Sequence, residues 1–481
     1  MESQREEVRV LMVAMAMQGH LNPMLRFAKL LVSKGVHVTL ATTEVALQSL
    51  SVDSRISNTF SIINQDSATP KTPRVHLEFF SDGLDDDFDR KNHIESFLES
   101  IQTKGSRNLS NLITNLESEN NKFSCIITNP FTPWVVAIAL EHDIPCAMLW
   151  IQSCTIYSLY YHFFKHPQLF PPLEDPNNTL MLPAMPVLQV KEIPSFILPS
   201  KPEIFKKMMA DLFQRLDKIK WVLGNSFKEL EEDVVASMAS LNPIIPVGPL
   251  VSPCMLGKKE TVAGNVDIWN AEDSCIEWLD KKPFSSVIYI SFGSLNVLTQ
   301  DQMDSVATAL KNSNRPFLWV IKPPAVRGSD DKKFCELKSG FLEETKERGL
   351  VVKWCSQERV LMHPSVACFM THCGWNSTLE TVVAGVPIIA YPEWTDQPLD
   401  AKLLVDVLKI GVKMRINGED TVLSAEEVER CITEVTEGLK AMEMKRRAVA
   451  LKEAAKKAVE DGGSIDQNMD RFISELKGIC R

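Results

Sequence analysis

Apolar segments that read as buried strands alternate with segments of helical periodicity along most of the chain. Residues 21–33, for example, carry apolar side chains at helical spacing and are soon followed by Gly35, a common helix terminator. Such alternation is typical of parallel α/β sheets. In the first half, the pattern predicts strands over residues 8–14, 36–42, 124–128, 145–150, 220–224 and 243–247. Residues 166–202 are rich in proline and are expected to form a long loop excursion.

The periodicity breaks down between residues 248 and 275, where Gly, Pro, Lys and Glu dominate, and we interpret this stretch as an interdomain linker. A second alternating set follows it. Strands are predicted over residues 286–292, 316–321, 350–354, 367–372 and 386–391, and helices over 301–312, 376–384 and 465–477. Ser424 and Glu427 have the spacing of a capping box.

These elements predict an α/β protein of two doubly wound, Rossmann-like domains that face each other across a cleft. The first domain is expected over residues 1–247 and the second over residues 276–460, joined by the linker 248–275. Residues 461–481 form a C-terminal helix that could pack back on the first domain. Ligands of such sheets bind beyond the carboxyl ends of the strands, which here would face the cleft.

Composition narrows the class of partner. The net charge of −10, with acidic and basic residues interspersed, argues against nucleic acid and anionic membranes as partners. The eleven cysteines show neither disulfide-like nor metal-like spacing, so they are expected to be small core residues in a reducing compartment. No apolar stretch approaches the ~20 residues that span a bilayer, and the start of the chain is acidic, so we predict a cytoplasmic protein.

The most specific signal is the segment 354–397, which reads WCSQERVLMHPSVACFMTHCGWNSTLETVVAGVPIIAYPEWTDQ. It closely resembles the signature of plant family 1 UDP-glycosyltransferases, two-domain enzymes of the GT-B fold. QGHLNP at 18–23, FTPW at 131–134, PVGPL at 246–250 and SFGS at 291–294 agree with this resemblance. LWIQSC, EIPSF at 192–196 and YPEWTDQPLDAKLLVDV look like the branch that forms glucose esters of phenolic acids.

The resemblance implies that the second domain binds a UDP-sugar. Trp354, expected at the end of a strand, is suited to stack on uracil, and Gln357 to bond the uracil or ribose edge. The segment 372–377 enters a helix, whose N-terminal amides favour a pyrophosphate. Glu380 is suited to the ribose hydroxyls. Further phosphate contacts are expected from His372, Asn376, Ser377 and Ser294.

Asp396 and Gln397 close the signature, and the resemblance implies that they hold the hydroxyls of the sugar, with Trp375 contributing through its backbone. A terminal glutamine is the usual mark of UDP-glucose enzymes in this family. UDP-glucose is therefore the expected donor.

His20 follows the first predicted strand and is the candidate catalytic base, since imidazole takes up a proton near neutral pH. The family pairs this histidine with an aspartate. Here the matching position is Asn129, which could accept from the ring N–H but could not offset the charge of an imidazolium. Glu141 lies too far along to be assumed a substitute.

Three other signals are rejected. The acidic run 85–89 contains the D-x-D spacing of some metal-dependent glycosyltransferases but is expected to be a solvated loop. His363, His372, Cys368 and Cys373 lack zinc-site spacing. No G-x-G-x-x-G follows the first strand, which argues against a nicotinamide or flavin enzyme.

The resulting prediction is an inverting, metal-independent UDP-glucose glucosyltransferase acting on a small aromatic acceptor, through a carboxyl group or an acidic phenol. C-glucosylation of an electron-rich polyphenol and a non-catalytic UDP-sugar-binding protein are the alternatives. No cofactor is expected, and a monomer is predicted. The loop 79–82 and the following side chains are expected to line the acceptor pocket: Phe131, Trp134, Ile151, Gln152, Phe196, Glu393 and Trp394.

Overall fold

The structure is a computed structural model that describes residues 7–46, 75–90, 92–117, 122–258, 274–293, 296, 298–321, 336–415 and 423–479. The chain divides into two compact units. The first comprises Met1–Val190, Phe196–Ile268 and Lys457–Arg481, and the second comprises Lys191–Ser195 and Trp269–Lys456. Each unit contains one parallel sheet with helices packed on it, the α/β architecture that the alternation predicts.

The sheet of the first unit has the strand order β3-β2-β1-β4-β5-β8-β9. β1 lies at the point where the order reverses, paired in parallel with both β2 and β4. Its strands are β1 Arg9–Val13, β2 His37–Thr43, β3 Val75–Phe80, β4 Cys125–Thr128, β5 Cys146–Trp150, β8 Ile219–Gly224 and β9 Ile244–Pro246. The six predicted strands are confirmed. The sequence analysis missed β3, an edge strand whose partly exposed positions include His76 and Glu78, so it lacks a continuous apolar run.

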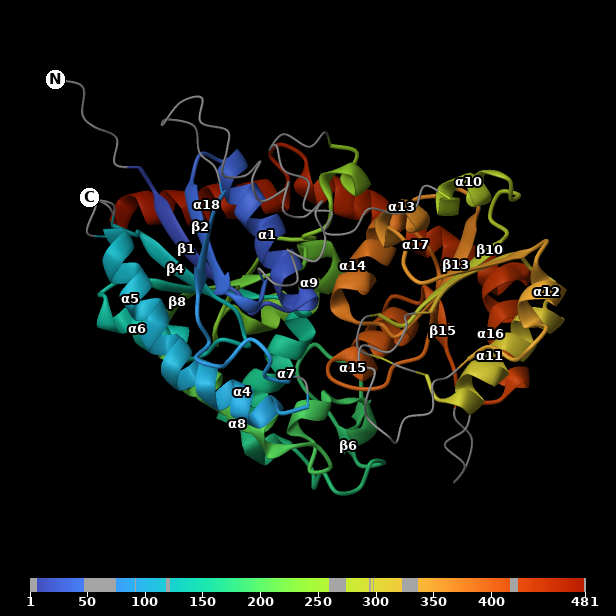
Figure 1. Cartoon of the computed structure of the whole chain (residues 1–481), viewed down its shortest axis with the longest axis horizontal. Coiled ribbons are helices and arrows are strands. Elements are labelled where there is room, and N and C mark those ends of the chain that lie inside the picture. The colour runs from blue at the N-terminus through green and yellow to red at the C-terminus, as the bar shows by residue number, and fades with distance from the viewer. Residues whose placement is uncertain are drawn as a thin grey trace. The chain divides into compact units, whose positions relative to one another are not determined.

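Helices cover both faces of this sheet, with α1 on one side and α5 and α6 on the other (Figure 1). α1 begins three residues before the predicted start, so that His20 lies inside its first turn. The helices are α1 Gln18–Ser33, α4 Ile94–Ser100, α5 Ser106–Glu117, α6 Val135–Glu141, α7 Cys154–Lys165, α8 Glu203–Gln214 and α9 Lys228–Met238. Within 166–202 the described backbone forms short helical turns and a two-stranded hairpin, β6 Thr179–Leu180 with β7 Leu188–Gln189.

The last helix, α18 Ser464–Ile479, belongs to the first unit. Trp221 of β8 packs edge-on against Phe472, with ring centroids 5.4 Å apart, and its Nε1 donates to Glu475 at 2.6 Å. Lys34, at the end of α1, forms an ion pair with Asp470 at 2.7 Å. Asn468 donates to the carbonyl of Pro246 at 2.8 Å. An aromatic contact and several polar contacts therefore hold α18 to this unit.

The sheet of the second unit has the order β12-β11-β10-β13-β14-β15. Its strands are β10 Val287–Ser291, β11 Phe317–Val320, β12 Gly349–Val352, β13 Val366–Thr371, β14 Ile388–Ala390 and β15 Gly411–Lys413. Five of these were predicted. β15 was missed because three residues are too few to show a period. β12 ends two residues before Trp354, so the expectation that Trp354 closes a strand is wrong.

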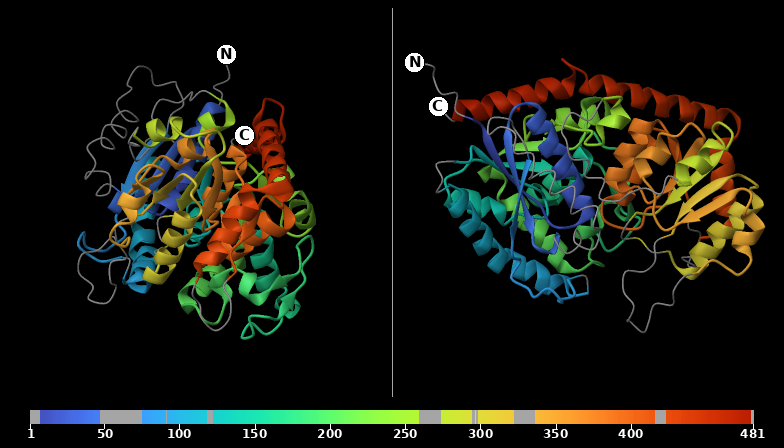
Figure 2. Two further views of the ribbon diagram at one scale, coloured as in Figure 1. Left: turned by 90° about the vertical axis from the view of Figure 1, so that its right-hand side faces the viewer. Right: turned by 45° about the horizontal axis from the view of Figure 1, so that its top comes forward.

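α11 and α16 pack together on one side of this sheet and α13 and α14 lie on the other (Figure 1). Figure 2 shows α11, in yellow, running along the strands. The helices are α10 Ser274–Asp280, α11 Gln300–Asn312, α12 Phe341–Thr345, α13 Gln357–Leu361, α14 Trp375–Ala384, α15 Gln397–Lys402, α16 Ala425–Thr436 and α17 Gly438–Val459.

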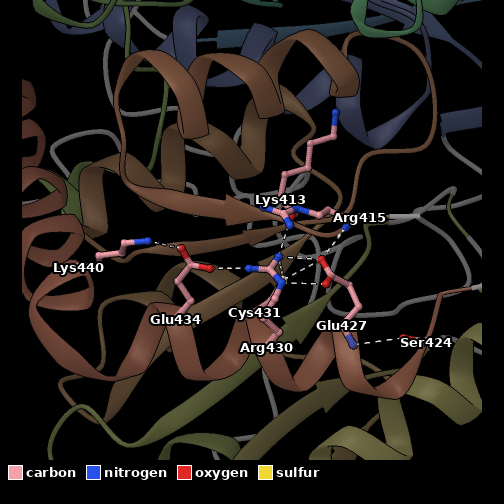
Figure 3. A network of polar contacts seen from close by, with 8 residues as sticks. All are labelled: Lys413, Arg415, Ser424, Glu427, Arg430, Cys431, Glu434 and Lys440. Carbon is pink, nitrogen blue, oxygen red and sulfur yellow. Dashed lines mark hydrogen bonds and ion pairs between the residues drawn. The ribbon is translucent and has the colours of Figure 1, made fainter. Parts of the chain in front are cut away.

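The predicted capping box at α16 forms only in part. Ser424 accepts a hydrogen bond from the amide of Glu427 at 3.3 Å. The Glu427 carboxylate does not reach back; it accepts from the amide of Arg415 at 2.8 Å and from the guanidinium of Arg430 at 2.7 Å (Figure 3). These donors, Arg430 first, lower the pKa of Glu427 and tie α16 to the end of β15. A complete capping box occurs instead at the start of α11, between Thr299 and Gln302.

Candidate functional site

His20 lies in the first turn of α1, beyond the carboxyl end of β1. Its ring stacks on Phe131, with centroids 4.1 Å apart and planes 13° from parallel. Nδ1 is shielded from solvent and, among the described residues, has no hydrogen-bond partner. This burial lowers the pKa of His20 to about 4, and the positive end of a helix acts in the same direction. The imidazole is therefore neutral at physiological pH.

Asn129, which follows β4, is fully buried and is bound to backbone rather than to His20. Its Nδ2 donates to the carbonyl of Val13 at 3.1 Å, and its Oδ1 accepts from the amide of Phe131 at 3.0 Å. The amide joins the end of β1 to the turn that carries Phe131. The bond that Asn129 could accept from the ring N–H of His20 is not formed in this structure, since Nδ1 of His20 has no partner among the described residues.

Among the predicted acceptor residues of the first unit, Phe196 contacts this turn through Phe131. Phe196 meets Phe131 edge-on at 6.4 Å and stacks on Phe205 at 4.7 Å. Trp134, which is 6% exposed, meets Phe80 edge-on at 6.3 Å. Ile151 and Gln152 directly follow β5 and are buried.

Glu231 is a buried residue that the sequence analysis missed. Its carboxylate accepts from the amides of Cys154 and Thr155, at 2.9 and 2.8 Å, and from the Thr155 hydroxyl at 2.7 Å. It therefore caps α7 immediately after Ile151 and Gln152 and fixes their position. No local signal marks it, because the contact joins residues 76 and 77 positions apart.

The loop after β3 is built around Asp82, which is 2% exposed. Both of its oxygens accept from the guanidinium of Arg90, at 2.7 and 3.1 Å. Asp85, Asp86 and Asp87 are exposed, as expected of a solvated loop. No group of three or more His, Cys, Asp or Glu side chains in the described ranges is arranged to hold a metal.

In the second unit, His372 follows β13 and begins the turn into α14. Its ring fills the space above two glycines. A Cβ at Gly293 would lie 2.7 Å from the ring, and one at Gly374 would lie 2.6 Å from it. Gly374 is the N-cap of α14 and has no side chain to cap it, so the first-turn amides of Trp375, Asn376 and Ser377 are directed beyond the helix end.

Gln357, the first residue of α13, connects three side chains of this region. Its Nε2 donates to Ser377 at 2.9 Å and to Glu380 at 2.7 Å, and its Oε1 accepts from the hydroxyl of Tyr289 at 3.2 Å. Glu380 is 7% exposed, so it is not an ordinary solvated helix glutamate. The structure thus brings together three of the residues predicted for the nucleotide, with Tyr289 as a member that the sequence analysis missed.

Residues 391–396 between β14 and α15 form a loop, here called the sugar loop. Gln397, the first residue of α15, stabilises it. The Oε1 of Gln397 accepts from the amides of Glu393 and Trp394, at 3.0 and 3.3 Å. Asn296, also missed, donates to the same oxygen at 3.2 Å and accepts from Nε1 of Trp394 at 3.0 Å. Asp396 and Gln397 are 7% and 5% exposed.

The remaining predicted residues are placed as follows. Trp354 is partly buried between β12 and α13, and Glu393 is exposed on the sugar loop. Ser294 lies outside the described residues. His363 bonds Ser365 at 2.8 Å and pairs with Asp280 at 3.1 Å, which accounts for it without a metal.

Comparison with known proteins decides the family. The chain is 48% identical to UDP-glycosyltransferase 84B1 of Arabidopsis thaliana, covering 98% of this chain and 99% of that one. The chain belongs to the UDP-glycosyltransferase family. The profile described as "UDP-glucoronosyl and UDP-glucosyl transferase" matches residues 274–447, which include the second-unit site described above.

This UDP-glycosyltransferase is 41% identical to gallate 1-beta-glucosyltransferase 84A24 of Punica granatum, over 98% of this chain and 89% of that one. Its structure is similar to Os79 from O. sativa in complex with UDP, with a TM-score of 0.78 and 27% identity, over 97% of this chain and all of that one. The GT-B fold expected from the sequence is thereby confirmed. Within the described residues, no helix is long and apolar enough to cross a membrane.

Proposed function

We propose that this enzyme transfers glucose from UDP-glucose to the carboxyl group of a small aromatic acid, giving a 1-β-glucose ester. The observation that carries this proposal is the state of His20, a neutral imidazole with no carboxylate partner among the described residues, beside an asparagine bound to backbone. The 41% identity to a gallate glucosyltransferase supports the same acceptor class.

The chemistry of the acceptor explains why such a histidine suffices. A carboxylic acid with pKa near ~4 arrives as an anion, whereas a phenol with pKa near ~10 must lose a proton during attack. A carboxylate behind the histidine helps most in the second case, because it stabilises the imidazolium that forms. Here, desolvation and the helix N-terminus both disfavour that cation. Neutral His20 would orient an anionic acceptor through a ring N–H.

The second unit supplies the groups for the donor. The first-turn amides of α14 and His372 would meet the charge of the pyrophosphate, as helix N-termini do for anions. Glu380 and Gln357 would bind the ribose and uracil side, and Asp396 and Gln397 the sugar. Because the Oε1 of Gln397 is used within its loop, its Nε2 is the group assigned to a sugar hydroxyl.

Attack of the acceptor oxygen on the anomeric carbon would break the bond to the UDP oxygen in a single displacement. This step inverts the α-linked donor to a β-glucose product. The leaving UDP would be stabilised by backbone N–H groups and His372, so the mechanism needs neither a metal nor a cofactor.

The test is an acceptor screen with UDP-glucose, scored by UDP release and by treatment of the products with mild alkali. We expect aromatic carboxylic acids to give the highest kcat/KM and products that alkali hydrolyses. Products that survive alkali would indicate O- or C-glucosides, and donor binding without turnover on any acceptor would indicate a UDP-sugar-binding protein.

A further inference from the structure

Residues Lys191–Ser195 belong to the second unit although the residues on either side of them belong to the first. All but Lys191 lie within the motif EIPSF at 192–196, to which the proposed reaction gives no role beyond Phe196. The segment contacts the second unit at two points, and these points lie near the two ends of α15.

The first point is the sugar loop. The amide of Thr395 donates to Oγ of Ser195 at 2.7 Å, and the amide of Ser195 donates to the carbonyl of Thr395 at 2.9 Å. Ser195 is 3% exposed, so water does not compete freely for these bonds. The first bond needs a side-chain hydroxyl, because an alanine would keep the second bond and lose the first.

The second point is Lys402, the last residue of α15. Its Nζ lies 3.1 and 3.0 Å from the two carboxylate oxygens of Glu192. Both side chains are largely buried, at 14% and 12% exposure, so this ion pair is better shielded from salt than a surface pair. The segment is therefore anchored to the helix that starts with Gln397.

Thr395 has an unusual backbone conformation, with φ +56°. A β-branched residue pays a steric cost in this left-handed region, so the surrounding contacts must hold it there. Its hydroxyl donates to Oδ1 of Asp396 at 2.7 Å, which sets the direction of that carboxylate. Ser195 therefore contacts the residue that directly precedes Asp396, one of the residues proposed to bind the sugar.

We propose that Ser195 is a positioning residue for the donor sugar. By binding both backbone groups of Thr395, it keeps the sugar loop in the conformation that presents Asp396 and Gln397 to glucose. Glu192 supports the same helix from its other end. This inference rests on the proposed sugar-binding role of Asp396 and Gln397.

The test compares UDP with UDP-glucose, because the sugar loop should affect only the ligand that carries the sugar. In Ser195→Ala we expect calorimetry without acceptor to show UDP-glucose binding about tenfold weaker, and UDP binding changed by less than about twofold. The preference for UDP-glucose over UDP-galactose should also fall. Ser195→Thr, which keeps the hydroxyl, should recover most of the lost affinity for UDP-glucose. Ser200 is an exposed serine of the same region, and Ser200→Ala should bind both ligands as wild type does.

Glu192→Gln provides a second measurement that does not depend on the folding of the Ser195 variant. It should weaken UDP-glucose binding by a few-fold and leave UDP binding unchanged. Equal losses for UDP and UDP-glucose, or no loss for either, would overturn the proposal. Since no acceptor is present, an error in the proposed acceptor class would not affect these results. If Asp396→Ala instead weakened the binding of UDP-glucose no more than the binding of UDP, the proposed sugar site itself would be rejected.

Discussion

The two units present functional residues in opposite ways. Around His20 the side chains are mainly aromatic, and the buried side-chain amide of Asn129 is bound to backbone through both its nitrogen and its oxygen. In the second unit polar side chains bind one another, as Gln357 binds Glu380 and Asn296 binds Gln397. A fixed polar network suits a single nucleotide sugar, whereas an apolar surface with one imidazole leaves the choice of acceptor to its shape and acidity.

The largest expected effect comes from replacing His20 in the first unit. His20→Ala should lower kcat for phenols of pKa near ~10 by about 10²–10⁴-fold, because no other group takes their proton. For an aromatic carboxylate the loss should be about tenfold or less, because only orientation is lost. Steady-state kinetics on both acceptors measure the difference, and UDP affinity, which the proposal assigns to the second unit, serves as the control. Equal losses on both acceptors would assign His20 the same role in each case.

The hydrogen-bonded network around Gln397 in the second unit is expected to make the enzyme selective for the donor sugar. We expect kcat/KM for UDP-glucose to exceed that for UDP-galactose by about tenfold or more, equivalent to ~1.4 kcal/mol in the transition state. The two donors are compared with one acceptor held at saturation. Equal values would show that the braced Gln397 does not read the sugar.

Asn129→Asp would introduce a carboxylate into the first unit, where the side chains around His20 are mainly aromatic. The change removes the bond to the Val13 carbonyl and places a buried charge beside that oxygen, so we expect a fall in Tm of about 6–12 °C for a cost of about 3 kcal/mol. It should also favour weakly acidic phenols over carboxylic acids by a few-fold, through support of an imidazolium.

The measurement is kcat/KM for phenols of rising pKa in wild type and mutant. Asn129→Ala is the control without added charge; it loses the bond from the Phe131 amide as well as the bond to the Val13 carbonyl. A relative gain that does not grow with phenol pKa would contradict the link between Asn129 and acceptor acidity.

A smaller effect is expected from pH. Because burial lowers the pKa of His20 to about 4, the ring stays unprotonated as the pH falls from about 8 to 5.5. An aromatic acid with pKa near ~4 remains ionised over the same range. The kcat/KM profile for such an acid should therefore be nearly flat, and a fall with an apparent pKa near ~6.5 would show an ordinary, solvated histidine.

The smallest effect should come from removing metals. Excess EDTA is expected to leave activity nearly unchanged, because the proposed mechanism assigns the charge of the leaving group to backbone amides and His372. Loss of most activity, restored by Mn²⁺ or Mg²⁺, would point to the exposed acids Asp85–Asp87 instead. The expected monomer and the cytoplasmic compartment stay predictions.

Much of the fold and the donor site could be read from the sequence because their signals are local. Each buried parallel strand is a short apolar run bounded by turns, and the turn from β13 into α14 lies within a few residues of His372. The elements that escaped were those without a local signal, such as the edge strand β3 and the three-residue β15.

Tertiary structure decided the contacts between residues distant in sequence. Sequence named Asn129 but not its partners, since the carbonyl of Val13 lies 116 positions away. It named Gln397 but not Asn296, and the EIPSF motif but not the bond from Ser195 to Thr395, 200 positions on. A buried polar group must find a partner, but which partner it finds depends on how the strands and helices pack, and no local pattern encodes that.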